Sequence, residues 1–248
     1  MPFKLSALAL AGLSFAAAAS GPHWEYEGRH GPAHWGHLSP ENAACERGAE
    51  QSPIDIRTAK VQRQADAPAL EFDYHAVPLR LVNNGHTLQV DEAGAGALSV
   101  AGHAYALAQF HIHTPSEERI DGKSYDMVAH LVHRDEAGKL AVVAVLFKRG
   151  RENPAFARVL ANAPLAAGPE HAVAGVEVSV ADLLPAQRGY YHFAGSLTTP
   201  PCSEGVQWYV LKTPVEVSAA QLKQVHLLYR HNNRPVQPLN GRVVIEHL

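Results

Sequence analysis

Short apolar or β-branched runs separated by turn residues fill most of the chain and predict strands. The runs cover residues 79–82, 87–90, 108–113, 127–133, 140–147 and 206–211, with clusters of Gly, Asn and Asp between several of them. The run 140–147 is apolar throughout, which is typical of a strand covered on both faces. This pattern predicts a single domain of the mostly β class.

Helical signals are few and lie outside these runs. Asn153-Pro154 predicts the start of a short helix that continues to Leu160, because Pro is favoured in a first helical turn. Ser218 followed three residues later by Gln221 is a capping-box pattern, and it predicts a second helix that ends near Tyr229. Both helices are expected at the periphery of the sheet.

The first nineteen residues form a pattern of their own. Lys4 is followed by an apolar run of about thirteen residues (5–17), and Ala17-Ala18-Ala19 offers an A-x-A cleavage site. The run is shorter than the about twenty apolar residues that a membrane-spanning helix needs. We therefore predict a secretory signal peptide over 1–19 and one domain over 20–248; a buried N-terminal helix is the alternative.

Composition narrows the classes of function. The 248 residues are 46% hydrophobic and 18% charged, which argues against a disordered tail or a coiled coil. The formal net charge is −3, so no basic excess is available to bind a nucleic-acid backbone. The chain contains 16 His against 7 Phe, and imidazoles are common metal ligands. The positions of the histidines therefore become the main question.

Two histidines share one face of a predicted strand. In the run 108–113, Gln109, His111 and His113 point to one side while Phe110 and Ile112 point to the other. Imidazoles at i and i+2 can approach the same metal ion. An isolated H-x-H pair, however, is more often a pair of hydrogen-bonded structural residues.

A third histidine comes from the predicted strand 127–133. His130 shares a face with Asp126, Val128 and Val132, whereas His133 lies on the opposite face, so His130 is the better candidate ligand. Three His ligands leave the fourth tetrahedral position of Zn²⁺ open for water, as in catalytic zinc sites.

The predicted export affects the interpretation of the two cysteines. Cys45 and Cys202 are 157 positions apart, too far for a CxxC redox or zinc motif. In an oxidising compartment they are expected to form a structural disulfide, and two unrelated buried thiols are the alternative.

Seven motifs in order along the chain resemble the α-class carbonic anhydrases, specifically their exported bacterial members. The matching stretches are Gly31-Pro-Ala-His-Trp35, Gln51-Ser-Pro-Ile-Asp-Ile56, Asn83-Asn-Gly-His86, Gln109-Phe-His-Ile-His-Thr-Pro-Ser-Glu117, His130-Leu-Val-His133, Ser196-Leu-Thr-Thr-Pro-Pro201 and Arg234-Pro-Val-Gln-Pro-Leu239. The resemblance implies a twisted, largely antiparallel ten-stranded sheet. It also implies reversible hydration of carbon dioxide to bicarbonate by zinc-bound hydroxide, with one Zn²⁺ per chain and secondary esterase activity.

The resemblance also implies a role for individual residues. His111, His113 and His130 match the zinc ligands, Thr198 and Glu117 match the pair that orients the nucleophile, and His86 matches the proton shuttle. The remaining matches are Val142, Leu197, Val206 and Trp208 for the apolar substrate wall, Thr199 for bicarbonate contact, Tyr26, Asn84 and Gln89 for the relay waters, and Gln109 and Asn232 for the hydrogen-bond partners of the first two ligands.

One position departs clearly from the family pattern. The third ligand of relatives donates to a Glu two positions before it, and here that position is Val128, which cannot accept a hydrogen bond. Glu118 also stands where many relatives have His or Asn. The sequence does not show which group accepts from His130 instead. We expect zinc to leave this protein faster than it leaves a Val128→Glu variant; another acceptor that already serves His130 is the alternative.

Two other classes of function compete with the enzyme. A silent carbonic-anhydrase-like binding module would typically have lost a zinc histidine, and a zinc-buffering protein would carry His-rich tracts, which this chain lacks. The expected partners are carbon dioxide and bicarbonate, with no nucleic acid and no transmembrane segment. A periplasmic or secreted location follows from the signal peptide, and a homodimer is the first expectation for the assembly.

Overall fold

The computed structural model describes residues 23–248, so the predicted signal peptide over 1–19 lies outside the described residues. The strands are β1 (Asp55–Ile56), β2 (Gln62–Arg63), β3 (Leu70–Tyr74), β4 (Val77–Asn83), β5 (Leu88–Asp91), β6 (Gly96–Val100), β7 (His103–His113), β8 (Arg119–Ile120), β9 (Lys123–Ser124), β10 (Met127–Arg134), β11 (Leu140–Arg149), β12 (His171–Val178), β13 (Tyr190–Ser196), β14 (Glu204–Leu211), β15 (Val215–Val217) and β16 (Ile245–His247). The α-helices are α1 (Trp35–Leu38), α2 (Ala44–Arg47), α3 (Pro154–Ala161) and α4 (Ala219–Leu228), and the 3₁₀ turns are η1 (Gly28–His30), η2 (Pro40–Asn42), η3 (Thr58–Lys60) and η4 (Val180–Leu183). Within residues 23–248, no helix has both the length and the apolar character needed to cross a membrane.

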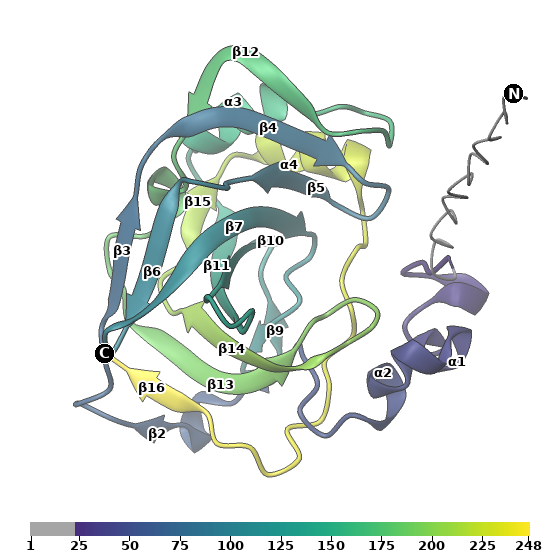
Figure 1. Ribbon diagram of the computed structural model, residues 1–248, viewed down its shortest axis with the longest axis vertical. Helices are drawn as coiled ribbons and strands as arrows, with labels where there is room; N and C mark the ends of the chain where they lie inside the picture. Colours follow the sequence, from purple (N-terminus) through teal and green to yellow (C-terminus); the bar gives the residue numbers. More distant parts are fainter. Residues whose placement is uncertain (1–22) are drawn as a thin grey trace, which may run out of the picture.

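One strongly curved sheet dominates the molecule (Figure 1). It has thirteen strands, ten of them in the continuous order β12-β4-β5-β7-β10-β11-β14-β13-β16-β2, while β3, β6 and β15 attach beside this path. Only the pairings β11–β14, β11–β15 and β2–β16 are parallel, so the sheet is largely antiparallel. A smaller sheet joins β1, β8 and β9. The mostly β prediction is confirmed, and the main sheet exceeds the expected ten strands because of the three that attach beside the path.

Both predicted helices form where the capping residues indicated. The Asn153 side chain accepts from the backbone N–H of Phe156 and begins α3, with Pro154 in its first turn. Ser218 and Gln221 form the complete capping box at the start of α4. In Figure 1 these two helices lie at the top of the sheet, far from α1 and α2 on the right.

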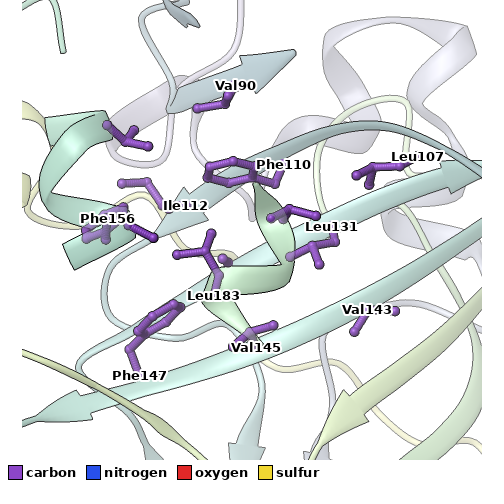
Figure 2. Close-up of a cluster of buried hydrophobic side chains, with 14 of the residues drawn as sticks. Val90, Leu107, Phe110, Ile112, Leu131, Val143, Val145, Phe147, Phe156 and Leu183 are labelled. Carbon is purple, nitrogen blue, oxygen red and sulfur yellow. The ribbon is translucent and has the colours of Figure 1, made fainter. Parts of the chain in front are cut away.

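Side-chain alternation divides β7, β10 and β11 between two different environments. On one face Phe110, Leu131 and Val143 pack into the main hydrophobic cluster, which Phe156 of α3 and Leu183 of η4 complete (Figure 2). On the other face of the same strands lie the three candidate ligands. Residues 141–147 of β11 are buried on both faces, as their continuous apolar run predicted. The large core thus supports a rigid platform for the histidines.

Candidate metal centre

Strand register brings the three predicted histidines together. His111 of β7 lies directly opposite His130 in the antiparallel pair with β10, and His113 follows two residues along the same face. One ligand nitrogen from each imidazole lies within 4.8 Å of the others. His133 lies on the opposite face, where its Nε2 is 2.6 Å from the hydroxyl of Tyr74. The sequence assignment of His130 rather than His133 to the cluster matches this geometry.

Hydrogen bonds fix the rings of the first two candidate ligands. His111 donates from Nδ1 to Oε1 of Gln109 (2.8 Å), and His113 donates from Nδ1 to the backbone carbonyl of Asn232 (2.6 Å). Because the proton of each neutral ring is held on Nδ1, both Nε2 atoms keep a lone pair for a metal. These are the two partners that the sequence indicated.

His130 does have an acceptor, which removes the reason for expecting faster zinc release than from a Val128→Glu variant. The Nε2 of His130 lies 3.1 and 3.2 Å from the two carboxylate oxygens of Glu118, which leaves Nδ1 facing the cluster. Val128 is fully buried and offers no polar atom, as its residue type requires. The carboxylate comes from a loop residue twelve positions before His130, so counting along the strand could not identify it. The available signals were a second Glu beside Glu117 and its departure from the His or Asn of many relatives at that position.

The three side chains fit a metal ion. His113 Nε2 is buried and has no hydrogen-bond partner among the described residues, an arrangement that a metal would satisfy. Burial lowers the pKa of His111 to about 3 and that of His113 well below its usual range, so both rings are neutral, as metal ligands must be. Burial also lowers the pKa of His130, but the charge and hydrogen bond of Glu118 outweigh it and raise the pKa. Three imidazoles with one open position match a catalytic zinc site.

Glu117 lies directly beside the cluster. It is 1% exposed; its Oε1 accepts from the backbone N–H of Arg234 (2.7 Å), while Oε2 lies 3.6 Å from His113 Nε2 and 3.8 Å from His130 Nδ1. Burial raises the pKa of this carboxyl to about 7, although His130, the Thr198 hydroxyl and the Arg234 N–H act in the opposite direction. Thr198 is itself buried, at 5% exposure. Glu117 is therefore adjacent to the histidines, and the Thr198 hydroxyl lies near enough to its carboxylate to affect the pKa.

Apolar side chains border the same cluster. Val142, Val206 and Trp208 belong to one buried group, and the half-buried Leu197 packs against it. The Trp208 ring meets the His130 ring edge-on, with centroids 4.9 Å apart. Thr199 is half-buried, and its backbone carbonyl accepts from the N–H of Cys202 (2.9 Å).

His86 lies on the turn between β4 and β5. The ring is half-buried and stacks on Trp24, with centroids 3.8 Å apart and planes at 11°. Burial and the nearby His23 lower the pKa of His86, and Glu25 opposes them. The backbone carbonyl of His86 accepts from the side chain of Asn232 (3.0 Å), the same residue that receives the His113 hydrogen bond.

The three residues predicted to order relay waters surround this region. Asn84 holds the turn, because its Oδ1 accepts from the backbone N–H of His86 (2.9 Å). Gln89 of β5 lies opposite His111 in the sheet register. The Tyr26 ring centroid is 6.5 Å from that of His113, and burial, with a contribution from Glu117, raises the pKa of Tyr26 well above its usual range.

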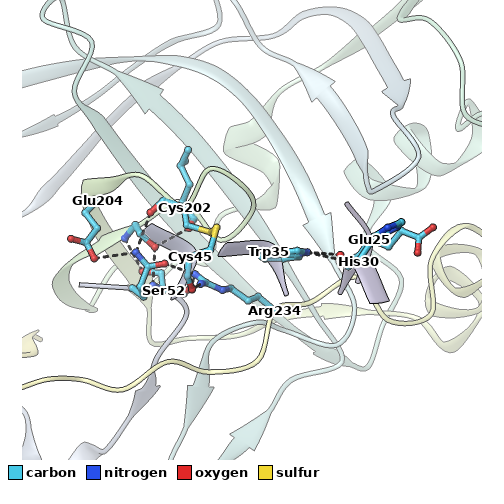
Figure 3. Close-up of a disulfide and its surroundings, with 11 residues drawn as sticks. Glu25, His30, Trp35, Cys45, Ser52, Cys202, Glu204 and Arg234 are labelled. Atoms are coloured by element: carbon cyan, nitrogen blue, oxygen red, sulfur yellow. Dashed lines mark hydrogen bonds between the residues drawn. A yellow bond between two sulfur atoms is a disulfide. The ribbon is translucent and has the colours of Figure 1, made fainter. Parts of the chain in front are cut away.

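A disulfide between Cys45 and Cys202 joins α2 to the loop that carries Thr198, as predicted (Figure 3). Sequence reasoning missed Arg234, which is 1% exposed and ties this region together. Its guanidinium donates to the carbonyl of Cys45 and to the side chain of Gln51 (2.8 Å each), while its backbone N–H holds Glu117. The Arg234-Pro motif gave the only sequence signal for this residue.

Comparisons of sequence and structure with known proteins match this chain to carbonic anhydrases. The profile of the eukaryotic-type carbonic anhydrase family matches residues 30–248. A carbonic anhydrase of Pectobacterium carotovorum is 42% identical over 99% of this chain and 100% of its own. The solved α-carbonic anhydrase of Thermovibrio ammonificans is 45% identical with a TM-score of 0.85, covering 91% of this chain and all of its own. That of Photobacterium profundum is 44% identical with a TM-score of 0.84, covering 90% of this chain and all of its own.

Proposed function

Because the chain belongs to the eukaryotic-type, or α, family of carbonic anhydrases, lyases that hydrate CO2, we propose that it interconverts carbon dioxide and bicarbonate with one Zn²⁺ held by His111, His113 and His130. The observation that carries this proposal is the free ligand nitrogen on each of three converging imidazoles. Each ring donates its other N–H to a defined acceptor, so all three are oriented toward one point.

Zinc bound there supplies an acidified water that is a nucleophile near neutral pH. The protein's own residues then orient that nucleophile. We assign Thr198 as the residue whose hydroxyl accepts a hydrogen bond from the nucleophile and donates its own hydrogen bond to Glu117. A Thr hydroxyl both donates and accepts, and an ionised Glu only accepts, so the direction of the chain is fixed once Glu117 is ionised, which its pKa of about 7 favours above neutral pH. Holding one lone pair toward the substrate is the kind of orientation that accelerates a bimolecular step.

The apolar group beside His130 is the proposed site for carbon dioxide. Val142, Val206, Leu197 and Trp208 present little polar surface, so they can hold a small apolar substrate without competing for the nucleophile. We assign Thr199, two residues from this wall, to contact with the bicarbonate product. An activated ester could occupy the same space, which accounts for the expected secondary esterase activity.

His86 is the proposed carrier of the proton to solvent. It lies on the turn between β4 and β5, half-buried against Trp24, and Asn84, Gln89 and Tyr26 supply polar atoms for ordered water. An imidazole is suited to this step because its ordinary pKa of about 6.5 is close to that of the donor water; burial and His23 place the pKa of His86 below that ordinary value.

We propose that the protein works outside the cytoplasm, in the periplasm or secreted. Support comes from the signal-peptide pattern over 1–19 and from the Cys45–Cys202 disulfide, which an oxidising compartment favours. A homodimer remains the prediction for the assembly, and no basic surface excess favours a nucleic acid.

Stopped-flow CO2 hydration together with zinc content tests the proposal. The purified protein should contain one zinc per chain, lose its activity on chelation and regain it when zinc is restored. Thr198→Ala should keep the metal while losing about 100-fold or more in rate, because only the orientation of the nucleophile is lost. An unchanged rate after complete zinc removal would refute the proposal.

A further inference from the structure

We infer that Glu118 is the positioning residue for His130. We also infer that positions 118 and 128 are coupled, so that a carboxylate is tolerated at either one of them but not at both. This inference rests on the proposed zinc site. It concerns how this chain's own residues hold His130, since Val128, two positions before it on the strand, cannot accept a hydrogen bond from the ring.

The contact itself is direct and buried. Both oxygens of the Glu118 carboxylate lie within 3.2 Å of His130 Nε2, Glu118 is 0% exposed and His130 is 1% exposed. In residues 23–248, no other side chain or carbonyl hydrogen-bonds to that nitrogen. A charged acceptor shielded from water holds a ring more firmly than a neutral acceptor or solvent does.

The loop between β7 and β8 holds this carboxylate in place without help from a metal. The Ser116 hydroxyl donates to the Glu118 carbonyl (2.8 Å) and accepts from the backbone N–H of Tyr125 (2.8 Å). The backbone N–H of Ser116 returns a bond to the Tyr125 carbonyl (3.0 Å), and the next residue, Arg119, donates to the Ile54 carbonyl (3.2 Å). Because its backbone is fixed on both sides, Glu118 is preorganised toward His130.

The environment of Val128 explains why only one of the positions 118 and 128 carries a carboxylate. Val128 lies two residues before His130 on the same face of β10, and it packs in the apolar group that contains Ile54, Ile56 and Val142. A Glu at this position would add a third buried carboxylate to Glu117 and Glu118 around one imidazole. Like charges so close in a buried site strongly disfavour one another. The apolar residue at 128 is therefore matched to the acid at 118.

Zinc dissociation into excess chelator measures the positioning role. We expect Glu118→Ala to release zinc about 10- to 100-fold faster than the wild type, and Glu118→Gln, which keeps an oxygen acceptor but no charge, to fall between them. The matched control is Glu92→Gln, since Glu92 is also a 0% exposed Glu but is not hydrogen-bonded to any histidine. This control should release zinc at the wild-type rate.

The melting temperature of the metal-free proteins separates positioning from a general structural role. If Glu118 acts through His130, Glu118→Gln should keep the metal-free melting temperature and lose only zinc retention. The visible spectrum of the cobalt-substituted protein should change in Glu118→Ala and stay the same in Glu92→Gln. A lower metal-free melting temperature with unchanged zinc release would overturn the inference.

The double variant tests the coupling. Val128→Glu alone should lower the metal-free melting temperature and leave zinc release no slower, whereas Glu118→Ala with Val128→Glu should retain zinc better than Glu118→Ala does. Additive effects of the two substitutions would show that the positions are independent. If the wild type binds no zinc, the proposed function fails; if it binds zinc and hydrates CO2 while Glu118→Ala releases zinc at the wild-type rate, only this inference fails.

Discussion

Glu92, the residue that follows β5, makes stability depend on pH in a way that one substitution can remove. Its side chain is 0% exposed, and neither carboxylate oxygen has a hydrogen-bond partner among the described residues. Burial raises the pKa of this carboxyl from 4.5 to about 8, with a further contribution from the neighbouring Asp91. An acid in such a site is neutral in the folded protein at pH 7, while the same acid is ionised in the unfolded chain.

The sign of the effect follows from proton binding. Between pH 4.5 and 8 the folded state holds a proton that the unfolded state has released, so stability falls as the pH rises through this range. The difference between the pKa of 4.5 and that of about 8, at about 1.36 kcal/mol for each pH unit, gives a total loss of about 5 kcal/mol above pH 8. At pH 7 the loss is about 3 kcal/mol, and below pH 4.5 it vanishes.

Glu92→Gln keeps the shape of the side chain and removes its titration. Urea unfolding of the disulfide-intact proteins from pH 5 to pH 9 should show the variant gaining stability relative to the wild type as the pH rises, by about 3–4 kcal/mol between pH 5 and pH 8. Glu71→Gln, at an exposed position of β3, is the control and should leave the pH profile unchanged. Parallel pH profiles for the wild type and Glu92→Gln would refute the reasoning.

Three further changes test the site and its support. His113→Ala should abolish stoichiometric zinc binding and CO2 hydration together, since two imidazoles hold zinc poorly; activity retained without zinc would show that the ligands are misassigned. His86→Ala should slow steady-state hydration by about 10-fold or more, spare CO2–bicarbonate exchange at equilibrium and respond to added imidazole buffer; an equal fall in exchange would make His86 structural. Reducing the Cys45–Cys202 bond, which closes a separation of 157 residues, should lower the free energy of unfolding by up to about 5 kcal/mol in urea titrations; an unchanged midpoint would contradict this.

Much of the metal centre could be predicted from sequence because it depends on local backbone geometry. Side chains alternate along a strand, so the spacing of Gln109, His111 and His113 places them on one face before any partner strand is known. The same rule separates His130 from His133. The apolar run 140–147 predicts a doubly covered strand, which the structure confirms for 141–147, and the capping residues of α3 and α4 also follow from patterns a few residues long.

Several strands could not be predicted, because their place depends on pairing with distant segments and not on local backbone geometry. The stretches that form β6 and β12 contain Gly, and much of β12 remains exposed, so no clear apolar alternation marks them; β3 does alternate, as Leu-Glu-Phe-Asp-Tyr, but the run is only five residues long. Pairing with neighbours stabilises them: β12 joins β4, while β6 joins β3 and β7. Their place in the sheet depends on partners distant in sequence, which a local pattern does not contain.

The partner of the third ligand was decided by tertiary structure alone. The resemblance to the family directed attention to Val128, two residues before His130 on the strand, and valine offers no acceptor there. The acceptor is Glu118, whose loop is fixed by contacts to Tyr125 and, through Arg119, to Ile54. Alternation along a strand is imposed by the backbone of each residue, and so it is written in the sequence. The direction of a loop side chain is set by the segments packed around it, and only the folded chain brings those segments together.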